Sequence, residues 1–255
     1  MHRFFAPPEA TRESEILLPE SEAHHAAKVL RCRPGDRAVV LNGQGDEILG
    51  ELVDVDKHSV RIRVLQRHQT PPPECAVTLA QAVTKPKSME TIIQKATELG
   101  ATRIVPVFSE RTVSLLDDSG AHQKAHKWRG IAIEAAKQCG TTWLPDVSVP
   151  LPIADYLERE QSPEVPFLAS LQPDARHPRE TFESFWTEHK RNPLSITVWI
   201  GPEGDFTPAE INAIRNTGAI PISLGPLVLR SETAALYCLS ILSYEVQQST
   251  KTPGK

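Results

Sequence analysis

The sequence predicts an α/β protein in two parts, a small all-β unit with one helix and a larger unit built on a parallel sheet. Alternating apolar segments dominate the first 70 residues, and strands alternate with helices after residue 75. Three consecutive prolines, Pro71–Pro73, separate these two patterns. Because proline does not continue a helix or a central strand and favours stiff polyproline II structure, we expect a domain boundary near residue 71.

Composition and charge exclude several classes of protein. The 255 residues are 40% hydrophobic and 24% charged, as in ordinary globular proteins. No apolar run approaches the ~18 residues of a membrane helix, and the N-terminus does not resemble a signal peptide. The four cysteines are far apart without a CxxC pair, which argues against a zinc site or a disulfide framework and favours reduced thiols in the cytoplasm. The net charge of −4 excludes a bulk polycation, so any binding of nucleic acid requires local basic patches.

The first unit is predicted to hold one helix and three strands. Glu20–Arg31 carries small and apolar residues at helical spacing and precedes a Pro34-Gly35-Asp36 turn. The strands that we expect are Ala38–Asn42, Glu47–Val55 and Ser59–Gln66. By its size, this unit is predicted to be a small β-barrel.

The second unit is predicted to alternate strands and helices, which is typical of a parallel sheet. The expected strands are Ala76–Val83, Ile104–Phe108, Pro166–Ser170, Ile196–Gly201 and Ile220–Leu224. The expected helices are Lys87–Leu99, Gln123–Gln138, Pro208–Thr217 and Glu232–Gln247.

Two glycine-proline loops follow predicted strands. The first, Gly201–Phe206, leads into a helix that Thr207-Pro208-Ala209-Glu210 begins as a capping box. The second begins at Gly225 and ends in Arg230, just before a helix that Ser231 caps. Taken singly, the first loop is better explained as a well-formed strand-to-helix turn, and Arg230 is equally well explained as a solvated surface charge. Because ligands bind beyond the carboxyl ends of parallel strands, and we expect these two strands to be neighbours, a shared pocket is favoured.

Several motifs in consistent order resemble a known family. GPEGDF at 201–206 and LGPLVLRSETAAL at 224–236 are similar to the paired C-terminal motifs of the SPOUT class of RNA methyltransferases. The closest resemblance is to the bacterial family that methylates N3 of a uridine, of the position 1498 type, in 16S ribosomal RNA. Further matching segments are His25–Arg31 with Gly35-Asp36, Ile92–Gly100, Ile104–Pro106, Ser109–Arg111 and Glu134–Gly140.

The resemblance implies a fold, a cofactor and partners. Residues 1–70 would form a PUA-like barrel that binds RNA, and residues 75–248 a SPOUT domain with a C-terminal trefoil knot. The cofactor would be S-adenosylmethionine (SAM), and the enzyme would act in the cytoplasm on 16S rRNA of the small ribosomal subunit. A homodimer with the pocket beside its interface is expected, without a membrane or a metal.

The resemblance also assigns candidate residues. Arg230 would stabilise the negative charge that develops on the uracil oxygens, and Glu203 would accept the imide proton or hold the loop. Main-chain and polar groups in and beside the two loops are the candidate cofactor-binding residues: Leu171, Ile200, Gly201, Pro202, Glu203, Gly204, Leu224, Gly225, Val228, Leu229, Thr233 and Ala234, with Ser231 as a minor contact. Basic side chains are the candidate RNA contacts: Arg3, His24, Lys28, Arg31 and Arg111.

The helical members of that basic set, His24, Lys28 and Arg31, fall at i, i+4 and i+7, which places them on one face of an α-helix. A phosphate-contacting stripe and a merely solvated face both explain this spacing. Three positions depart from the family pattern: Asp205 stands where glycine is usual, and Leu227 and Thr141 stand where arginine is common.

Two other functions compete with the methyltransferase. One is a non-catalytic RNA-binding or ribosome-assembly factor with the same fold, which would not bind SAM. The other is a hydrolase that uses Cys139 or Ser231 with a histidine, which the absence of a GxSxG motif disfavours.

Overall fold

The computed structural model describes residues 1–112, 118–159 and 162–248. The chain divides into two compact units. The N-terminal unit comprises Met1–Pro72 together with Ile133–Leu144, and the C-terminal unit comprises Pro73–Ala132 and the chain from Pro145 onward.

The N-terminal unit is built on a five-stranded sheet in the order β1-β3-β4-β5-β2. Its strands are β1 (His2–Phe5), β2 (Glu15–Leu17), β3 (Arg37–Leu41), β4 (Asp46–Val55) and β5 (Val60–Gln69). β1 pairs with β3 in parallel, and the other pairs are antiparallel. The three predicted strands are confirmed as β3–β5, whereas β1, β2 and the 3-10 helix η1 (Pro8–Thr11) were not predicted.

Apolar side chains from every strand of this sheet form the core of the N-terminal unit. Phe4, Ile16, Val40, Ile48 and Ile62 are completely buried there. The segment Ile133–Leu144 also belongs to this unit: the Trp143 indole N–H donates to the carbonyls of Thr70 (3.2 Å) and Pro71 (2.9 Å).

The predicted helix Glu20–Arg31 is shorter and less regular than its sequence indicates. It consists of α1 (Glu20–His24) followed by a π-helical turn, η2 (His25–Val29). The Leu30 N–H donates to the His25 carbonyl, five residues back, and Arg31 has a left-handed φ of 55°. A spacing of i, i+4 and i+7 shares one face only at 3.6 residues per turn, so the prediction that His24, Lys28 and Arg31 lie on one α-helical face is wrong. All three side chains are nevertheless exposed.

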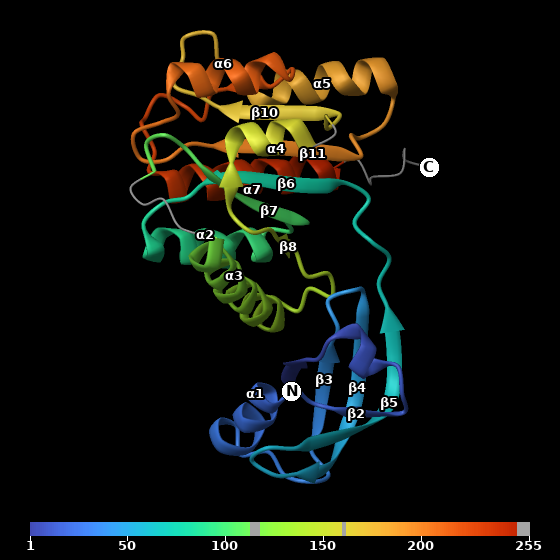
Figure 1. Ribbon diagram of the computed structural model, residues 1–255. Coiled ribbons are helices and arrows are strands. Elements are labelled where there is room, and N and C mark those ends of the chain that lie inside the picture. Colours follow the sequence, from blue (N-terminus) through green and yellow to red (C-terminus); the bar gives the residue numbers. More distant parts are fainter. Residues whose placement is uncertain (113–117, 160–161, 249–255) are drawn as a thin grey trace. The chain divides into compact units, whose positions relative to one another are not determined.

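The C-terminal unit is built on a wholly parallel sheet in the order β12-β10-β11-β6-β7-β8, with β9 also paired to β7 (Figure 1). Its strands are β6 (Ala76–Ala82), β7 (Arg103–Phe108), β8 (Asp146–Val147), β9 (Leu151–Pro152), β10 (Val165–Ala169), β11 (Ser195–Ile200) and β12 (Ile220–Ile222). Its helices are α2 (Pro86–Glu98), α3 (Asp118–Cys139), which ends in the N-terminal unit, α4 (Ile153–Arg159), α5 (Pro178–His189), α6 (Pro208–Asn216) and α7 (Ser231–Gln248). All five predicted strands and four predicted helices are confirmed, whereas α4, α5, β8 and β9 were not predicted.

Helices cover both faces of this sheet (Figure 1). α4 and α6 pack on one face, where Tyr156, Trp199, Phe206 and Ile214 share a buried cluster. α2 and α7 pack against each other, and α7 contacts β6 and β11 on the other face. The expectation that β11 and β12 are neighbours is wrong, because β10 lies between them. The residues that follow β10 therefore lie at the same edge of the sheet as the two glycine-proline loops.

Within the described residues, no helix combines the length and the apolar character of a membrane span. In the same part of the chain, no three His, Cys, Asp or Glu residues gather into a group that could hold a metal ion.

Candidate cofactor pocket and active site

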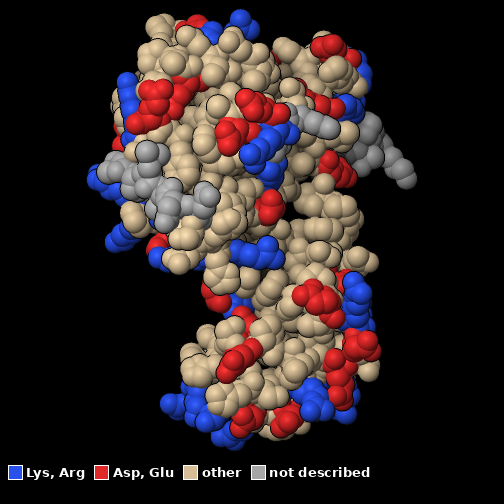
Figure 2. Space-filling view, in the orientation of Figure 1, with Lys and Arg blue, Asp and Glu red and all other residues tan. Residues whose placement is uncertain are grey.

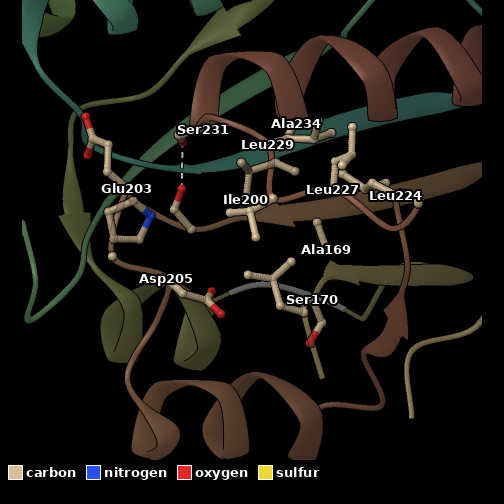
Figure 3. A pocket seen from close by; sticks show the side chains of 16 residues that line it. Ala169, Ser170, Ile200, Glu203, Asp205, Leu224, Leu227, Leu229, Ser231 and Ala234 are labelled. Carbon is tan, nitrogen blue, oxygen red and sulfur yellow. Dashed lines mark hydrogen bonds between the residues drawn. The ribbon is translucent and has the colours of Figure 1, made fainter. Parts of the chain in front are cut away.

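A cavity of about 260 Å³ opens at the carboxyl ends of β10 and β11 and beside the start of α7 (Figure 3). This is the edge at which open parallel sheets bind ligands. Three loops and the first turn of α7 line it: Ala169–Leu171, Ile200–Asp205, Leu224–Gly225 with Leu227–Leu229, and Ser231 with Ala234. Every candidate cofactor-binding residue lies in this lining except Thr233.

The rim of the cavity is apolar and exposed. The side chains of Leu171, Leu227 and Val228 are 60%, 72% and 79% exposed, which is unusual for large apolar residues. In the part of the chain that the structure describes, the backbone amides of Leu227, Val228 and Leu229 donate no hydrogen bond. Apolar surfaces next to free main-chain donors suit a flat heteroaromatic ligand such as adenine.

Gly225 shapes the second loop at the cavity. Its φ of 105° is a conformation that side chains with a Cβ rarely adopt. A Cβ built at this position would meet nothing within 4 Å, so the glycine is required by the backbone conformation and not by a close neighbour. The first loop has its own constraint, because a Cβ at Gly201 would lie 3.0 Å from Asp205 Oδ1.

A buried hydrogen-bond chain joins the two loops. Ser231 Oγ donates to the Gly201 carbonyl at 2.6 Å, as the dashed line in Figure 3 shows. Gln81 Nε2 donates to Ser231 Oγ and to the Ala82 carbonyl, both at 3.0 Å. Since the two carbonyls only accept, they fix the orientation of the Gln81 amide and the direction of the Ser231 hydroxyl. Ser231 was predicted to contact the cofactor, but its hydroxyl proton is donated to the Gly201 carbonyl.

The predicted capping box at the start of α6 is confirmed and has two further contacts. Thr207 Oγ1 accepts from the Glu210 N–H, and Glu210 Oε2 accepts from the Thr207 N–H. The same carboxylate accepts from Ser109 Oγ at 3.0 Å and from the Glu110 N–H at 2.8 Å. Glu210 is buried, and it fixes the segment after β7 to the start of α6.

Arg111, a candidate RNA contact, supports the first loop. Its Nη1 donates to the Gly204 carbonyl and, at 3.4 Å, to the Asp205 carbonyl. The sequence shows Arg111 as part of a family motif but gives no sign of these contacts, which span more than 90 residues.

The two candidate catalytic side chains lie at the outside of the pocket. Arg230 is exposed, and only its carbonyl is engaged, by the Ala234 N–H at 2.8 Å. Glu203 lines the cavity, is exposed and turns its carboxylate away from Ile200 and Leu229 (Figure 3). Neither side chain forms a hydrogen bond or an ion pair within the described residues.

The candidate RNA contacts of the N-terminal unit fall into two groups. Arg3 Nη1 donates to the carbonyls of Lys137 and Gln138, both at 3.2 Å, and so binds the end of α3 within this unit. His24, Lys28 and Arg31 are exposed, and no ion pair involves them in the described chain. Figure 2 shows basic atoms at the end of this unit where α1 lies.

Comparison with known proteins identifies the family. The RNA methyltransferase domain family matches residues 71–243, and the RNA methyltransferase PUA domain family matches residues 18–65. The chain belongs to the RNA methyltransferase family. This membership confirms the resemblance seen in the sequence motifs.

Relatives of this RNA methyltransferase match it over most of their length. The chain is 32% identical to the ribosomal RNA small subunit methyltransferase E of Synechocystis, and the match covers 94% of this chain and 76% of that protein. It is also 32% identical to the protein of the same name from Bacillus subtilis, over 89% of this chain and 88% of that one.

Solved structures resemble the whole fold. A methyltransferase from Legionella pneumophila with bound SAM has a TM-score of 0.85 and 29% identity, covering 95% of this chain and 96% of that one. The ribosomal RNA small subunit methyltransferase E of Neisseria gonorrhoeae, bound to SAM, has a TM-score of 0.81 and 26% identity over 96% and 97% of the two chains.

Proposed function

We propose that this RNA methyltransferase transfers the methyl group of SAM to N3 of a specific uridine in 16S rRNA of the small ribosomal subunit. The observation that carries the proposal is the cavity, which both family motifs line at the carboxyl edge of the sheet. Relatives named for small-subunit rRNA methylation and structural neighbours solved with SAM support the substrate and the cofactor. These findings favour an enzyme over the non-catalytic assembly factor. A serine hydrolase is disfavoured because the Ser231 hydroxyl donates its proton to the Gly201 carbonyl and not to a histidine.

The lining residues fit SAM. The free amides of Leu227–Leu229 would offer donors to the hydrogen-bonding edge of adenine, and the exposed side chains of Leu171 and Val228 would offer apolar contacts to its ring. When bound, SAM supplies an electrophilic methyl group on a positively charged sulfur. The Gln81–Ser231–Gly201 hydrogen-bond chain keeps the two loops that line the cavity at a fixed separation.

The uridine must be presented unpaired, because N3–H lies on the Watson–Crick edge of the base. Removing that proton leaves negative charge on O2 and O4 of the uracil. Arg230 stabilises this charge, since a guanidinium stays protonated and offers a planar set of donors. Glu203 accepts the proton or holds the loop. The exposure of both side chains in the described chain leaves them accessible to an RNA substrate.

The resemblance supplies the architecture that we propose around this site. Residues 1–70 act as a PUA-like barrel that contacts rRNA, and residues 75–248 act as a SPOUT domain whose last strands and α7 form a trefoil knot. The enzyme works as a homodimer in the cytoplasm, with the pocket beside the interface. The exposed Leu227 at the cavity and Tyr237 and Tyr244 on α7 support an apolar partner surface there.

The function is tested on ribosomal RNA from a strain that lacks this protein. Small subunits from that strain are incubated with the purified enzyme and SAM, and the 16S rRNA is digested and analysed by mass spectrometry. We expect 3-methyluridine to be absent before incubation and restored after it. Binding of SAM and RNA without methylation of either naked rRNA or subunits would contradict the proposal and favour an assembly factor.

The loop connection provides a second test. Replacing Ser231 with alanine leaves Gln81 Nε2 and the Gly201 carbonyl without their shared partner, so we expect the free energy of unfolding to fall by about 1–3 kcal/mol. SAM affinity, measured by calorimetry, should weaken several-fold because the loops no longer have a fixed separation. Ser184→Ala is the matched control: Ser184 Oγ donates to the Glu180 carbonyl on an exposed part of α5, and Ser184 does not line the cavity. Equal behaviour of the two variants would show that the connection has no role.

Salt dependence tests the basic residues near α1. Replacing Lys28 and Arg31 with alanine should weaken RNA binding and reduce the slope of log K against log salt by ~0.7–0.9 for each phosphate that the protein no longer neutralises. Arg12→Ala, at another exposed position of the N-terminal unit, serves as the control. If the slope of the double variant equals that of Arg12→Ala, these side chains are only solvated.

A further inference from the structure

Asp205 occupies a backbone conformation that favours glycine. Its φ is 62°, in the left-handed region that residues with a side chain rarely adopt. Aspartate tolerates it because its short side chain bonds locally: Oδ1 accepts from the Phe206 N–H at 2.8 Å. A strained residue at a ligand pocket suggests that its side chain has a function there.

The Asp205 carboxylate faces the cavity without a direct ion-pair partner in the described chain. The residue is half-buried and lines the cavity, and in Figure 3 its carboxylate points toward the part that Ser170 lines. Oδ1 is engaged by Phe206, but within the described chain Oδ2 accepts no hydrogen bond and no ion pair involves either oxygen. The Arg111 guanidinium donates to backbone carbonyls of the loop and not to this carboxylate.

We propose that Asp205 sets the charge specificity of the cofactor pocket, strengthening binding of the methyl donor, with its positive sulfonium, relative to the product, which lacks that charge. The inference rests on the proposed function, in which this cavity binds SAM. SAM carries a positive sulfonium, and S-adenosylhomocysteine carries a neutral thioether in its place. The remaining groups of the two molecules are the same, so a fixed negative charge distinguishes them through that one difference.

The size of the effect follows from Coulomb attraction. A carboxylate several ångströms from a unit positive charge, at an effective dielectric constant between that of a protein surface and that of water, favours the cation by about three- to tenfold in affinity. Glu203 also lines the cavity, but it is exposed and its carboxylate turns away, so its field is more strongly screened. The consequence for the enzyme is weaker product inhibition.

Asp205→Asn isolates the charge. Asparagine also tolerates the left-handed conformation, and its side-chain oxygen can still accept from the Phe206 N–H, so the loop keeps its local bond. Asp205→Gly removes the side chain as well and relieves the backbone. Glu188→Gln is the charge-matched control, because Glu188 is an exposed carboxylate of α5 that does not line this cavity.

The test is calorimetric binding to the full-length protein and these three variants. The ligands are SAM, S-adenosylhomocysteine and sinefungin, which carries a protonated amine near the place of the sulfonium. We expect both Asp205 variants to bind SAM and sinefungin about three- to tenfold more weakly relative to S-adenosylhomocysteine. Glu188→Gln should keep the wild-type ratios.

Other outcomes separate the inference from the function on which it rests. If Asp205→Asn weakens all three ligands equally, or changes none of them, Asp205 only shapes the loop and the inference is wrong while the cofactor pocket stands. If Asp205→Gly changes the ratios but Asp205→Asn does not, the effect belongs to the backbone and the inference is again wrong. If the wild-type protein binds none of the ligands, the proposed function itself fails.

Discussion

Replacing Arg230 with alanine is expected to lower the single-turnover rate of uridine methylation by about 10²–10³, as for removal of one donor from an oxyanion site. The loss should appear in the chemical step, because Arg230 does not line the cavity and its side chain makes no ion pair within the described chain. SAM affinity should therefore change by less than about twofold, a shift well below 1 kcal/mol. Rapid-quench kinetics with saturating enzyme and calorimetry measure the two quantities separately.

Two further variants decide between the candidate catalytic roles. Arg230→Lys should recover little activity, because an ammonium is a point charge and lacks the planar set of donors. Glu203→Gln removes a proton acceptor while keeping the shape of the side chain. If Glu203→Gln abolished turnover and Arg230→Ala kept a near-normal rate, the proposed roles would be reversed.

Local sequence patterns predicted the parts of the site that depend on neighbouring residues. The capping box of Thr207 and Glu210 is complete within four residues, so the sequence alone reveals it. Of the twelve cofactor-binding residues that the motif resemblance assigned, eleven line the cavity and Thr233 does not.

Contacts between distant segments could not be predicted in the same way. Gln81 and Ser231 are 150 residues apart, and Ser109 and Glu210 are 101 apart. Apolar periodicity indicates that β10, β11 and β12 are strands but not that β10 lies between the others. The π-helical turn at His25–Val29 was missed because small and apolar residues in a helical pattern favour an ordinary α-helix.

The ion pairs of Lys137, near the end of α3, are another tertiary contact that the sequence pattern does not reveal. Lys137 Nζ lies 2.7 Å from Glu22 Oε1 and 2.7 Å from Glu134 Oε1, within the N-terminal unit. The side chains of Lys137 and Glu22 are only 8% and 9% exposed. Burial opposes the charged lysine, but the hydrogen bonds with Glu134 and Glu22 outweigh it and raise the pKa of Lys137.

Lys137→Met is therefore expected to destabilise the protein strongly, by about 3–5 kcal/mol, because it leaves the Glu22 carboxylate buried without its cation. Glu22 Oε2 already has no hydrogen-bond partner, so the carboxylate has no alternative. The control is Lys127→Met on the same helix: the Lys127–Glu90 pair is largely exposed, and its loss should cost less than about 1 kcal/mol. Denaturant unfolding measures both.

Removing both charges tests the mechanism of this loss. The double variant Glu22→Leu, Lys137→Met should recover most of the stability, since a buried ion pair replaced by apolar side chains is often neutral or stabilising. Because the folded state raises the pKa of Lys137, its contribution is fully present below the ordinary lysine pKa of about 10.4 and is lost as the pH rises through the higher folded value. The stabilities of the wild type and Lys137→Met should accordingly converge at strongly alkaline pH. A difference between them that stayed constant across that range, with no recovery in the double variant, would assign the effect to packing of the lysine stem instead of to its charge.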